Sequence, residues 1–480
     1  MRSIELTTRS SDSSNGTETI SPAGKLIHGY LGSIPSSEPK LEVDTQAMLS
    51  NKPGSTVSKT LRKSIQEISG DGRLMSLPAQ EEHVLYESSV YVVTHVFGSQ
   101  TGSRLTEVYL WAGATVPEAA VADAQIFAKK VAREAGSGPR STPAVILVQQ
   151  GREPAEFFQA LGGIVITRRG ARANSATKAY MLCGRPHVGH VAFDEVDLST
   201  RSFCSAFPYV VVHPLTIQES KVCLWRGSHC GPEAVGSARL ISMDLNSSSA
   251  DVVEVAEGRE TEDFWTVFAH ESKRHRTTKV ESLQGIGDRL SPRLFRIEAL
   301  APRKTSSAFL SLFTSGRGSV SRPTSAHRPN SSASGKSITL TSPSLDGVKP
   351  QIAATELSPP SQMELEPEHV YVLDCIGKIY VFPGPLLISS QYWEDAFTQA
   401  LLFANEYAIL AASVEDRMKM PQAEVIFGAV PLDAKHVFRS WDESRGLWGS
   451  GGLMAGRAQS TNGEDMVSVR EALDVCCFAR

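Results

Sequence analysis

The stretch VYLWAG at residues 108–113 decides the fold of this chain, because it marks an apolar strand that ends in a Trp-x-Gly turn. A second copy, VCLWRG, stands at residues 222–227. Each copy follows an apolar stretch, VYVV or YVVV, and precedes an Ala-containing helix, another apolar strand and the tripeptide Gly-Arg-Glu. A unit that recurs after roughly a hundred residues predicts tandem small domains, since a unit of that size can enclose its own core.

A degraded third copy follows the first two. It consists of VYVLD at residues 370–374, IYVFPG at residues 379–384 and a helix through Ala400, Ala404 and Tyr407. Three units agree with the number of domains that a chain of 480 residues usually forms.

The pattern of apolar residues predicts an α+β fold. Continuous apolar runs such as residues 90–93 are typical of central strands buried on both faces of a sheet. The helix that begins near Pro117 has a single apolar stripe that should lie across the sheet, made of Val121, Ala124, Ala128, Val131 and Ala135. We therefore predict three tandem domains, each a mixed sheet of about five strands between a long and a short helix.

Two segments contain too few apolar residues to order by themselves, residues 1–72 and about 301–350. We expect residues 1–72 to be mostly disordered, with one short helix at 60–67, and residues 301–350 to be a disordered insert. The three units are then expected at residues 73–172, 173–275 and 289–445, followed by a flexible tail at 446–480 with a short helix at 467–475.

Composition narrows the function classes. The chain has 48 basic and 52 acidic residues, a net charge of -4, which gives no reason to expect nucleic acid as a partner. Its seven cysteines show no C-x-x-C spacing, and neither a signal peptide nor an apolar run of membrane-spanning length occurs. No phosphate loop, nucleophile elbow or kinase signature is present. We expect a soluble cytoplasmic protein that is not an enzyme and carries no cofactor.

The repeated unit resembles the actin-binding repeats of the gelsolin/villin family. The residues that carry the resemblance are Trp111-x-Gly113, Trp225-x-Gly227, the long helices that follow them, and Gly-x-Glu-Pro before Gly162-Gly163. The resemblance covers about residues 73–445 without the insert, as in a three-repeat half of a gelsolin. It implies actin as a partner and the actin cytoskeleton as the location.

The resemblance also implies three degenerate calcium sites. Repeats of this family bind calcium through a Gly-Asp pair before the central strand and a Glu in the long helix, because calcium requires hard oxygen ligands. The corresponding positions hold Ser89 and Ala120 in the first unit, Phe207 and Ala234 in the second, and His369 and Ala396 in the third. Carboxylates stand one or two positions away, but a one-residue shift turns a helical side chain by about 100 degrees. We expect no bound metal.

Clusters of basic residues are the candidate contact sites. Lys129, Lys130 and Arg133 lie toward the exposed side of the first long helix, the element that family members insert into an actin cleft. Candidate sites for phosphoinositides or another acidic surface are Arg168, Arg169, Arg172, Lys273, Arg274 and Arg276. Solvated linker charge is the simpler reading of these six.

Two functions from different classes remain. The first is a gelsolin-like actin-binding protein that binds filaments, with capping or severing as further activities, and that has lost calcium regulation. The second is a protein-interaction scaffold that does not bind actin, as gelsolin-like domains form in vesicle-coat proteins, because a fold does not dictate its partner.

Overall fold

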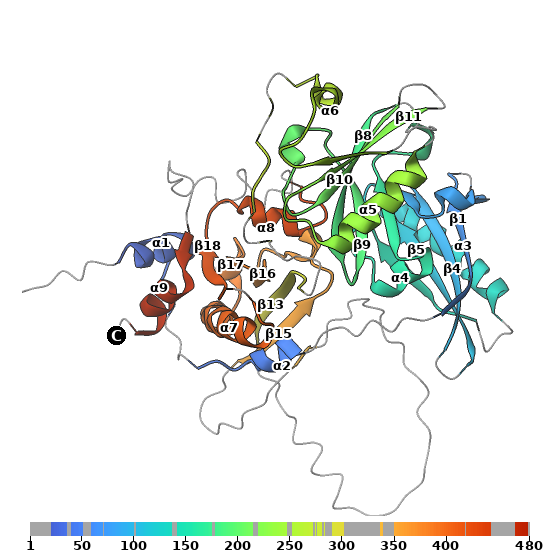
Figure 1. Ribbon diagram of the computed structural model, residues 1–480. Helices are drawn as coiled ribbons and strands as arrows, with labels where there is room; N and C mark the ends of the chain where they lie inside the picture. Colours follow the sequence, from blue (N-terminus) through green and yellow to red (C-terminus); the bar gives the residue numbers. More distant parts are fainter. Residues whose placement is uncertain are drawn as a thin grey trace, which may run out of the picture.

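The computed structural model describes residues 21–35, 40–50, 59–70, 72–99, 102–136, 142–174, 178–214, 219–246, 252–271, 274, 276–280, 283, 290–301, 337–338, 350–417, 419–442 and 466–478. Within these ranges the chain forms three mixed sheets with helices on their faces (Figure 1). The second sheet lies between the first and the third. The predicted α+β class is confirmed. None of the described helices is both long and apolar enough to cross a membrane.

The first sheet has five strands in the order β2-β1-β4-β5-β6. Their bounds are Lys59–Ile68 for β1, Leu74–Ser76 for β2, Val90–Gly98 for β4, Arg104–Ala112 for β5 and Val145–Gln149 for β6. The pairings are antiparallel except for β5 with β6, which is parallel. Helix α3 (Glu118–Ala135) packs its alanines against one face, while α4 (Ala155–Leu161) packs two phenylalanines against the other.

The second sheet has seven strands in the order β12-β11-β10-β8-β9-β7-β3. Their bounds are Val84–Tyr86 for β3, Ile164–Arg168 for β7, Tyr180–His187 for β8, His190–Val196 for β9, Pro208–Pro214 for β10, Ser220–Arg226 for β11 and Val253–Ala256 for β12. Helix α5 (Pro232–Leu245) covers one face, and α6 (Glu262–Trp265) stands on the other. Strands β3 and β7 come from the segment expected to form the first unit, so the first two units share a sheet.

The third sheet also has seven strands, in the order β14-β15-β13-β16-β17-β18-β19. Their bounds are Arg293–Leu300 for β13, Ser337–Ile338 for β14, Gln351–Leu357 for β15, Val370–Asp374 for β16, Lys378–Pro383 for β17, Gln422–Ile426 for β18 and Met466–Ser468 for β19. Helix α7 (Trp393–Val414) covers one face and α8 (Leu432–Val437) the other. The expected five strands thus hold for the first sheet, whereas the other two have seven.

The remaining elements are short. Helices α1 (Pro22–Leu31), α2 (Thr45–Ser50) and α9 (Val469–Leu473) lie at the two ends of the chain. Single turns of 3-10 helix stand at Ala79–Glu81, Arg172–Asn174, Thr200–Ser202, Thr266–Phe268, Gln362–Glu364 and Leu387–Ser389, and a π turn stands at Asp474–Phe478.

The glycine that ends the repeated turn, Trp-x-Gly in the first two units and Phe-Pro-Gly in the third, is required for the same structural reason in all three. A Cβ atom on Gly113 would lie 2.1 Å from the carbonyl oxygen of Glu87, in the loop that enters the central strand. On Gly227 it would lie 2.3 Å from the Ser205 oxygen, and on Gly384 2.2 Å from the Pro367 oxygen. Only glycine permits this close approach of backbone to backbone.

A buried tyrosine near the start of each central strand repeats in the same way. Its hydroxyl oxygen accepts the backbone N–H of the residue five positions earlier, at 3.2 Å for Tyr91 and Tyr86, 3.0 Å for Tyr209 and Cys204, and 2.7 Å for Tyr371 and Glu366. The three sheets therefore share local contacts that the repeated apolar pattern alone does not specify.

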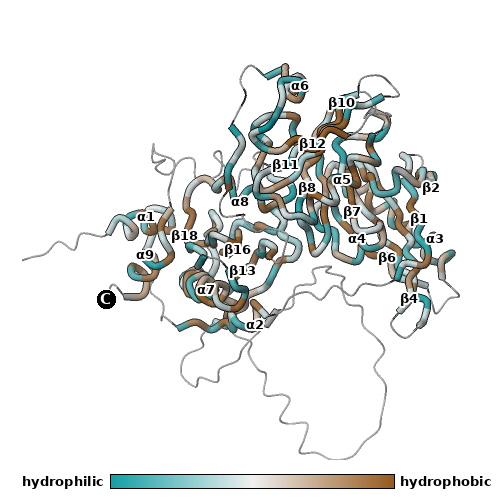
Figure 2. The backbone as a smooth tube through the Cα atoms, viewed as in Figure 1, coloured by the Kyte–Doolittle hydropathy of each residue, from teal (hydrophilic) through white to brown (hydrophobic). Residues whose placement is uncertain are grey.

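Hydrophobic clusters show how the units join. Figure 2 shows apolar residues along the strands inside each sheet. The face of the second sheet beside α6 and the face of the third sheet beside α8 form one continuous cluster, which includes Trp225 and Phe438. A shared core of this kind holds two units in one fixed arrangement, because separating them would expose apolar surface to water.

Two expectations for the chain ends were wrong. Residues 60–67 belong to β1 instead of a helix, because β1 pairs with β4 from Lys59 to Ile68 and this tertiary pairing overrides local propensity. The first sheet thus begins before residue 73. Helices α1 and α2 stand within residues 1–72, and they are ordered by packing on the third unit.

At the other end, α9 falls within the helix expected at 467–475, but it packs into the third core instead of belonging to a flexible tail. Most of the expected insert, residues 302–336 and 339–349, lies outside the described residues.

Candidate functional site

The outer face of α3 is the candidate contact surface. Ala124, Ala128 and Ala132 face the sheet and are buried. On the opposite side Ile126 is 64% exposed, with Lys129, Lys130 and Arg133 exposed one and two turns further along the helix. Residues three, four and seven positions apart lie on the same side of a helix. An exposed apolar side chain therefore lies beside three cations.

Helix α5 presents a smaller surface of the same kind. Leu240 and Met243 are 54% and 59% exposed and stand three residues apart, so they lie on one side of the helix. Arg239 on the same helix pairs with Glu254 of β12 at 2.8 Å. Helices α3 and α5 thus both carry exposed apolar residues beside charged ones.

The position expected to bind calcium in the first unit is occupied by a hydrogen-bonded cluster. The Ser89 hydroxyl donates to Glu67 at 2.6 Å, and the Arg172 guanidinium donates to the other oxygen of the same carboxylate at 3.1 Å. Arg172 also pairs with Glu81. Ala120 lies exposed on α3. A side-chain cation therefore neutralises the carboxylate nearest to this position.

The corresponding positions of the other two units carry no carboxylate. Phe207 and Ala234 are both buried in the second unit. In the third unit Ala396 is buried, and His369 lies 3.0 Å from Glu366. Among the residues that the structure describes, no group of three or more His, Cys, Asp or Glu side chains is placed to hold a metal ion.

Three of the predicted basic residues form ion pairs within the chain. Arg168 is buried, pairs with Glu195 at 2.7 Å and lies over the Tyr180 ring. Arg172 is held as described above. Arg169 pairs with Asp197 on the surface, where half of its side chain is exposed. The structure does not gather the three guanidinium groups into one external patch.

The second predicted basic cluster is only partly described. Lys273 lies outside the described residues. Arg274 pairs with Glu262 at 2.7 Å and stacks over Trp265, while Arg276 is exposed. Binding of an anionic surface by the six basic residues stays a prediction.

A buried ion-pair network at Arg439, which joins all three units, was not predicted. The guanidinium lies 2.5 Å from Glu153 of the first unit and 2.7 Å from Asp194 of β9 in the second. Arg439 itself follows α8 in the third unit. All three residues are largely shielded from water, so each charge depends on the others.

The pKa shifts in this network follow from burial and from the Arg439 charge. Burial alone would raise the pKa of Asp194, but the Arg439 guanidinium lowers it below its ordinary value. Burial, and then the nearby Arg439 charge, lower the pKa of His187 from 6.5 to about 3. His187 is therefore neutral at neutral pH, and its Nε2 lies 2.9 Å from the Glu153 carbonyl oxygen.

The repeated Gly-Arg-Glu tripeptide supplies one of the two carboxylates of this network, that of Glu153. The Trp111 indole N–H donates to the Glu153 carboxylate at 2.9 Å, and Trp225 donates to Glu260 at 2.8 Å. The glutamate of the motif thus fixes the tryptophan of the Trp-x-Gly turn in both units. In the first unit the same carboxylate also accepts from Arg439, so a local contact becomes part of the interface between units.

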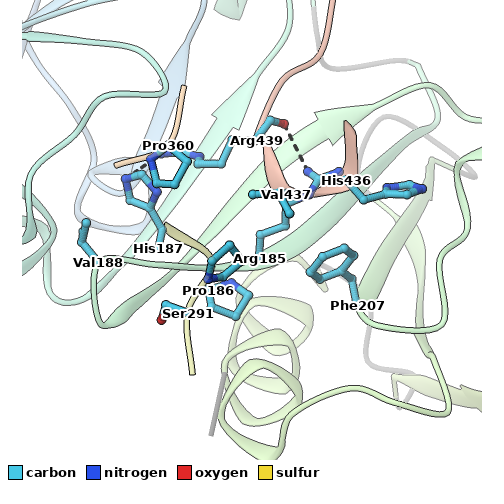
Figure 3. A pocket seen from close by; sticks show the side chains of 11 residues that line it. Arg185, Pro186, His187, Val188, Phe207, Ser291, Pro360, His436, Val437 and Arg439 are labelled. Carbon is cyan, nitrogen blue, oxygen red and sulfur yellow. Dashed lines mark hydrogen bonds between the residues drawn. The ribbon is translucent and has the colours of Figure 1, made fainter. Parts of the chain in front are cut away.

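A small pocket borders this network (Figure 3). It is lined by Arg185, His187, Phe207, Ser291, Pro360, His436 and Arg439, among others. Arg185 donates to the Arg439 carbonyl oxygen at 3.2 Å across it. Burial, with help from Arg185, lowers the pKa of His436 to about 4. The pocket therefore holds neutral histidines beside arginines, at the contact of the second and third units.

Comparison with known proteins finds distant similarity to gelsolin and to flightless-1 homologs. A family model described as a domain of unknown function (DUF7904) matches residues 64–169. The human protein flightless-1 homolog is 23% identical over 199 residues, which is 39% of this chain and 15% of that protein. Gelsolin from Xenopus laevis is 25% identical over 198 residues, which is 39% of this chain and 44% of that gelsolin.

Among solved structures, the crystal structure of the Thorarchaeota 2DGel3/rabbit actin complex matches 43% of this chain and 98% of the other chain, with 17% identity and a TM-score of 0.17. The matched region spans less than half the length of the curated relatives above. Their similarity supports a gelsolin-like relationship for this chain.

Proposed function

We propose that this protein binds actin through the outer face of α3. The observation that carries the proposal is the exposed Ile126 with Lys129, Lys130 and Arg133 beside it on one side of a rigid helix. An amphipathic helix with an apolar residue at the centre of a polar rim suits an apolar groove on a partner. The acidic surface of such a groove would attract the three cations.

Similarity to gelsolin and to flightless-1 homologs supports actin as the partner. Helix α5, with Leu240 and Met243 exposed, is proposed as a second contact. Severing requires two contacts spaced along a filament, so α3 and α5 together are the minimum for it. Capping or binding to the side of a filament requires only one. The proposed role is one of binding at the actin cytoskeleton and involves no catalysis.

We further propose that the arrangement of the units does not depend on calcium. In the first unit the Arg172 guanidinium meets the Glu67 carboxylate next to Ser89, where relatives of the family use a metal ion. Between units, Arg439 supplies the positive charge that joins Glu153 to Asp194. Both cations belong to the chain, and neither is lost on chelation. Calorimetric titration should detect no calcium binding in the micromolar range, and binding that disappears with a chelator would overturn this proposal.

Co-sedimentation with actin filaments, with and without calcium, tests the proposed function. Pelleting under both conditions is expected. Pelleting only with calcium would contradict calcium independence. If the protein stays in the supernatant under both conditions, filament binding is refuted, and the alternative of an interaction scaffold without actin is favoured.

The double substitution Lys129→Glu and Lys130→Glu tests the surface itself. Reversing two charges beside the contact should weaken filament binding about tenfold, a change of about 1.4 kcal/mol. The matched control is Lys59→Glu with Arg62→Glu, which makes the same charge change on exposed positions of β1. Equal affinity of the two double variants would rule out α3 as the contact.

A further inference from the structure

Helix α7 differs from the other two long helices, because residues 396–404 are buried or half-buried on every side. Only three residues of α3 are buried, all on one side. In α7 the buried residues include six in succession, Ala396, Phe397, Thr398, Gln399, Ala400 and Leu401. A helix with this pattern must be covered on more than one side.

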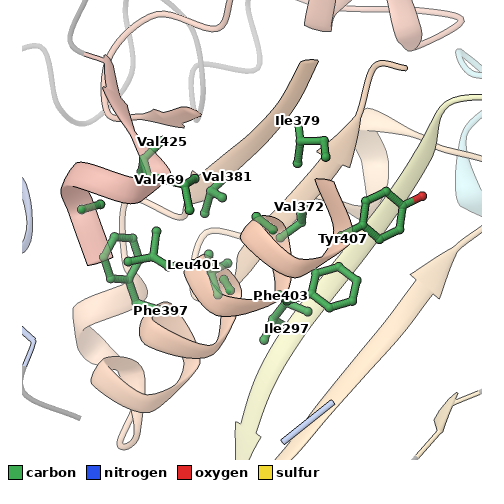
Figure 4. Close-up of a cluster of buried hydrophobic side chains, with 14 of the residues drawn as sticks. Ile297, Val372, Ile379, Val381, Phe397, Leu401, Phe403, Tyr407, Val425 and Val469 are labelled. Atoms are coloured by element: carbon green, nitrogen blue, oxygen red, sulfur yellow. The ribbon is translucent and has the colours of Figure 1, made fainter. Parts of the chain in front are cut away.

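One side of α7 packs on its own sheet. The Phe295 ring of β13 lies 5.2 Å from the Phe403 ring and 5.3 Å from the Tyr407 ring. Figure 4 shows Phe403 and Tyr407 on the side of Ile297, whereas Phe397 points the other way, toward Val469 of α9. The third sheet therefore accounts for only part of the apolar surface of α7.

The two ends of the chain cover much of the rest around residues 396–404, whereas Ile409 and Val414 near the C-terminal end of α7 stay 48% and 50% exposed. From the N-terminal end, Met48 and Leu49 of α2 are 2% and 1% exposed and belong to the same cluster as α7. From the C-terminal end, Val469 and Ala472 of α9 are buried in that cluster too. Figure 1 shows α2 beside α7, and α1 beside α9.

Polar contacts fix the position of the N-terminal segment. The Gln399 side chain of α7 accepts the backbone N–H of Glu42 at 3.0 Å and donates to the Lys40 carbonyl oxygen at 2.7 Å. Arg293 of β13 donates to the Met48 carbonyl oxygen at 2.7 Å. A buried glutamine that pairs with both backbone groups of an extended peptide is a specific recognition contact, because each group would lose a partner if the peptide left.

We propose that the outer face of α7 around residues 396–404 is a docking surface for a peptide with an extended N-terminal part and a short apolar helix. Residues 40–50 of this chain occupy it and compete there with actin. The inference rests on the proposed function, in which the outer faces of long helices bind actin. Because residues 396–404 of α7 are covered, this part of the helix is closed to actin while residues 40–50 are in place. Displacement of residues 40–50 makes the third long helix available.

The test uses the full chain with Met48→Ser and Leu49→Ser, which removes the apolar anchors without changing α7. A second variant, Gln399→Ala, removes only the two backbone contacts. The control is Met75→Ser, an exposed methionine on β2. A fluorescent synthetic peptide of residues 40–50 should bind to the double variant at least tenfold more tightly than to the wild type or the control.

Sedimentation equilibrium with monomeric actin then measures the number of actin molecules bound per chain. The double variant should bind one more than the wild type, and added peptide 40–50 should return it to the wild-type number. An unchanged number, with peptide captured by the variant alone, refutes the competitor role. Failure of every variant and the wild type to bind actin refutes the proposed function instead, while peptide capture still reports whether the surface is a docking site.

Discussion

Replacement of Arg439 by methionine is the strongest test of the structural reasoning. The variant keeps an unbranched side chain in the same space but removes the only guanidinium that contacts both Glu153 and Asp194 within the described residues. Two carboxylates are then left in a place where Glu153 is 0% and Asp194 13% exposed. Breaking a buried ion pair by removing one partner costs about 3–5 kcal/mol.

We therefore expect Arg439→Met to lower the free energy of unfolding by about 3–5 kcal/mol. Urea unfolding followed by tryptophan fluorescence is a suitable assay, since Trp111 donates to Glu153 and reports on the network directly. Each transition is fitted separately, because a chain with several cores need not unfold in one step. Adding Glu153→Gln and Asp194→Asn to Arg439→Met should recover part of the loss, since no buried charge is then left without a partner.

Arg169→Met is the matched control. Arg169 makes the same type of pair with Asp197, but the two side chains are 50% and 76% exposed. An exposed pair contributes at most about 1 kcal/mol. A loss below about 1 kcal/mol for Arg439→Met, equal to that of the control, would refute the view that this network joins the units.

Three further predictions concern pH, the turn glycine and the contact helix. Burial lowers the pKa of His187 to about 3 and that of His436 to about 4, so below pH 6.5 the unfolded chain binds protons that the folded chain does not. The free energy of unfolding should therefore fall as the pH decreases from 6.5 toward 4. The variant His187→Gln should show a weaker dependence of the urea midpoint on pH. Gly113→Ala places a Cβ atom 2.1 Å from the Glu87 oxygen and should lower the thermal unfolding midpoint by several degrees. The control Gly102→Ala, in a loop with open space, should lower the midpoint less, although Gly102 has a positive φ. Ile126→Ser should weaken filament binding about tenfold. It should leave the free energy of unfolding unchanged, because Ile126 is 64% exposed in the free protein. A loss of stability in this variant would show that Ile126 belongs to the core and is not a contact residue.

Much of the fold could be predicted because it depends on local patterns. The apolar runs, the Trp-x-Gly turns and the alanine stripe of α3 each reflect a contact within one unit, and the structure has a strand, a turn or a helix at each. Residues 60–67 were misassigned because the sequence TLRKSIQE lacks a clear period of apolar residues, and pairing with β4 determines its conformation. The apolar residues around all sides of the first half of α7 could have indicated from the sequence that another segment covers this helix, since a single sheet buries only one side of a helix.

The sequence by itself determined the repeated α+β unit and the absence of carboxylates at the aligned positions Ser89, Phe207 and His369, because both follow from residue identity at fixed spacing. Only the tertiary structure decided how the units are joined. Arg439 stands 286 residues from Glu153 and 245 from Asp194, and Gln399 stands 357 from Glu42. No periodicity relates residues so far apart, since their contact arises only when complete units pack against one another.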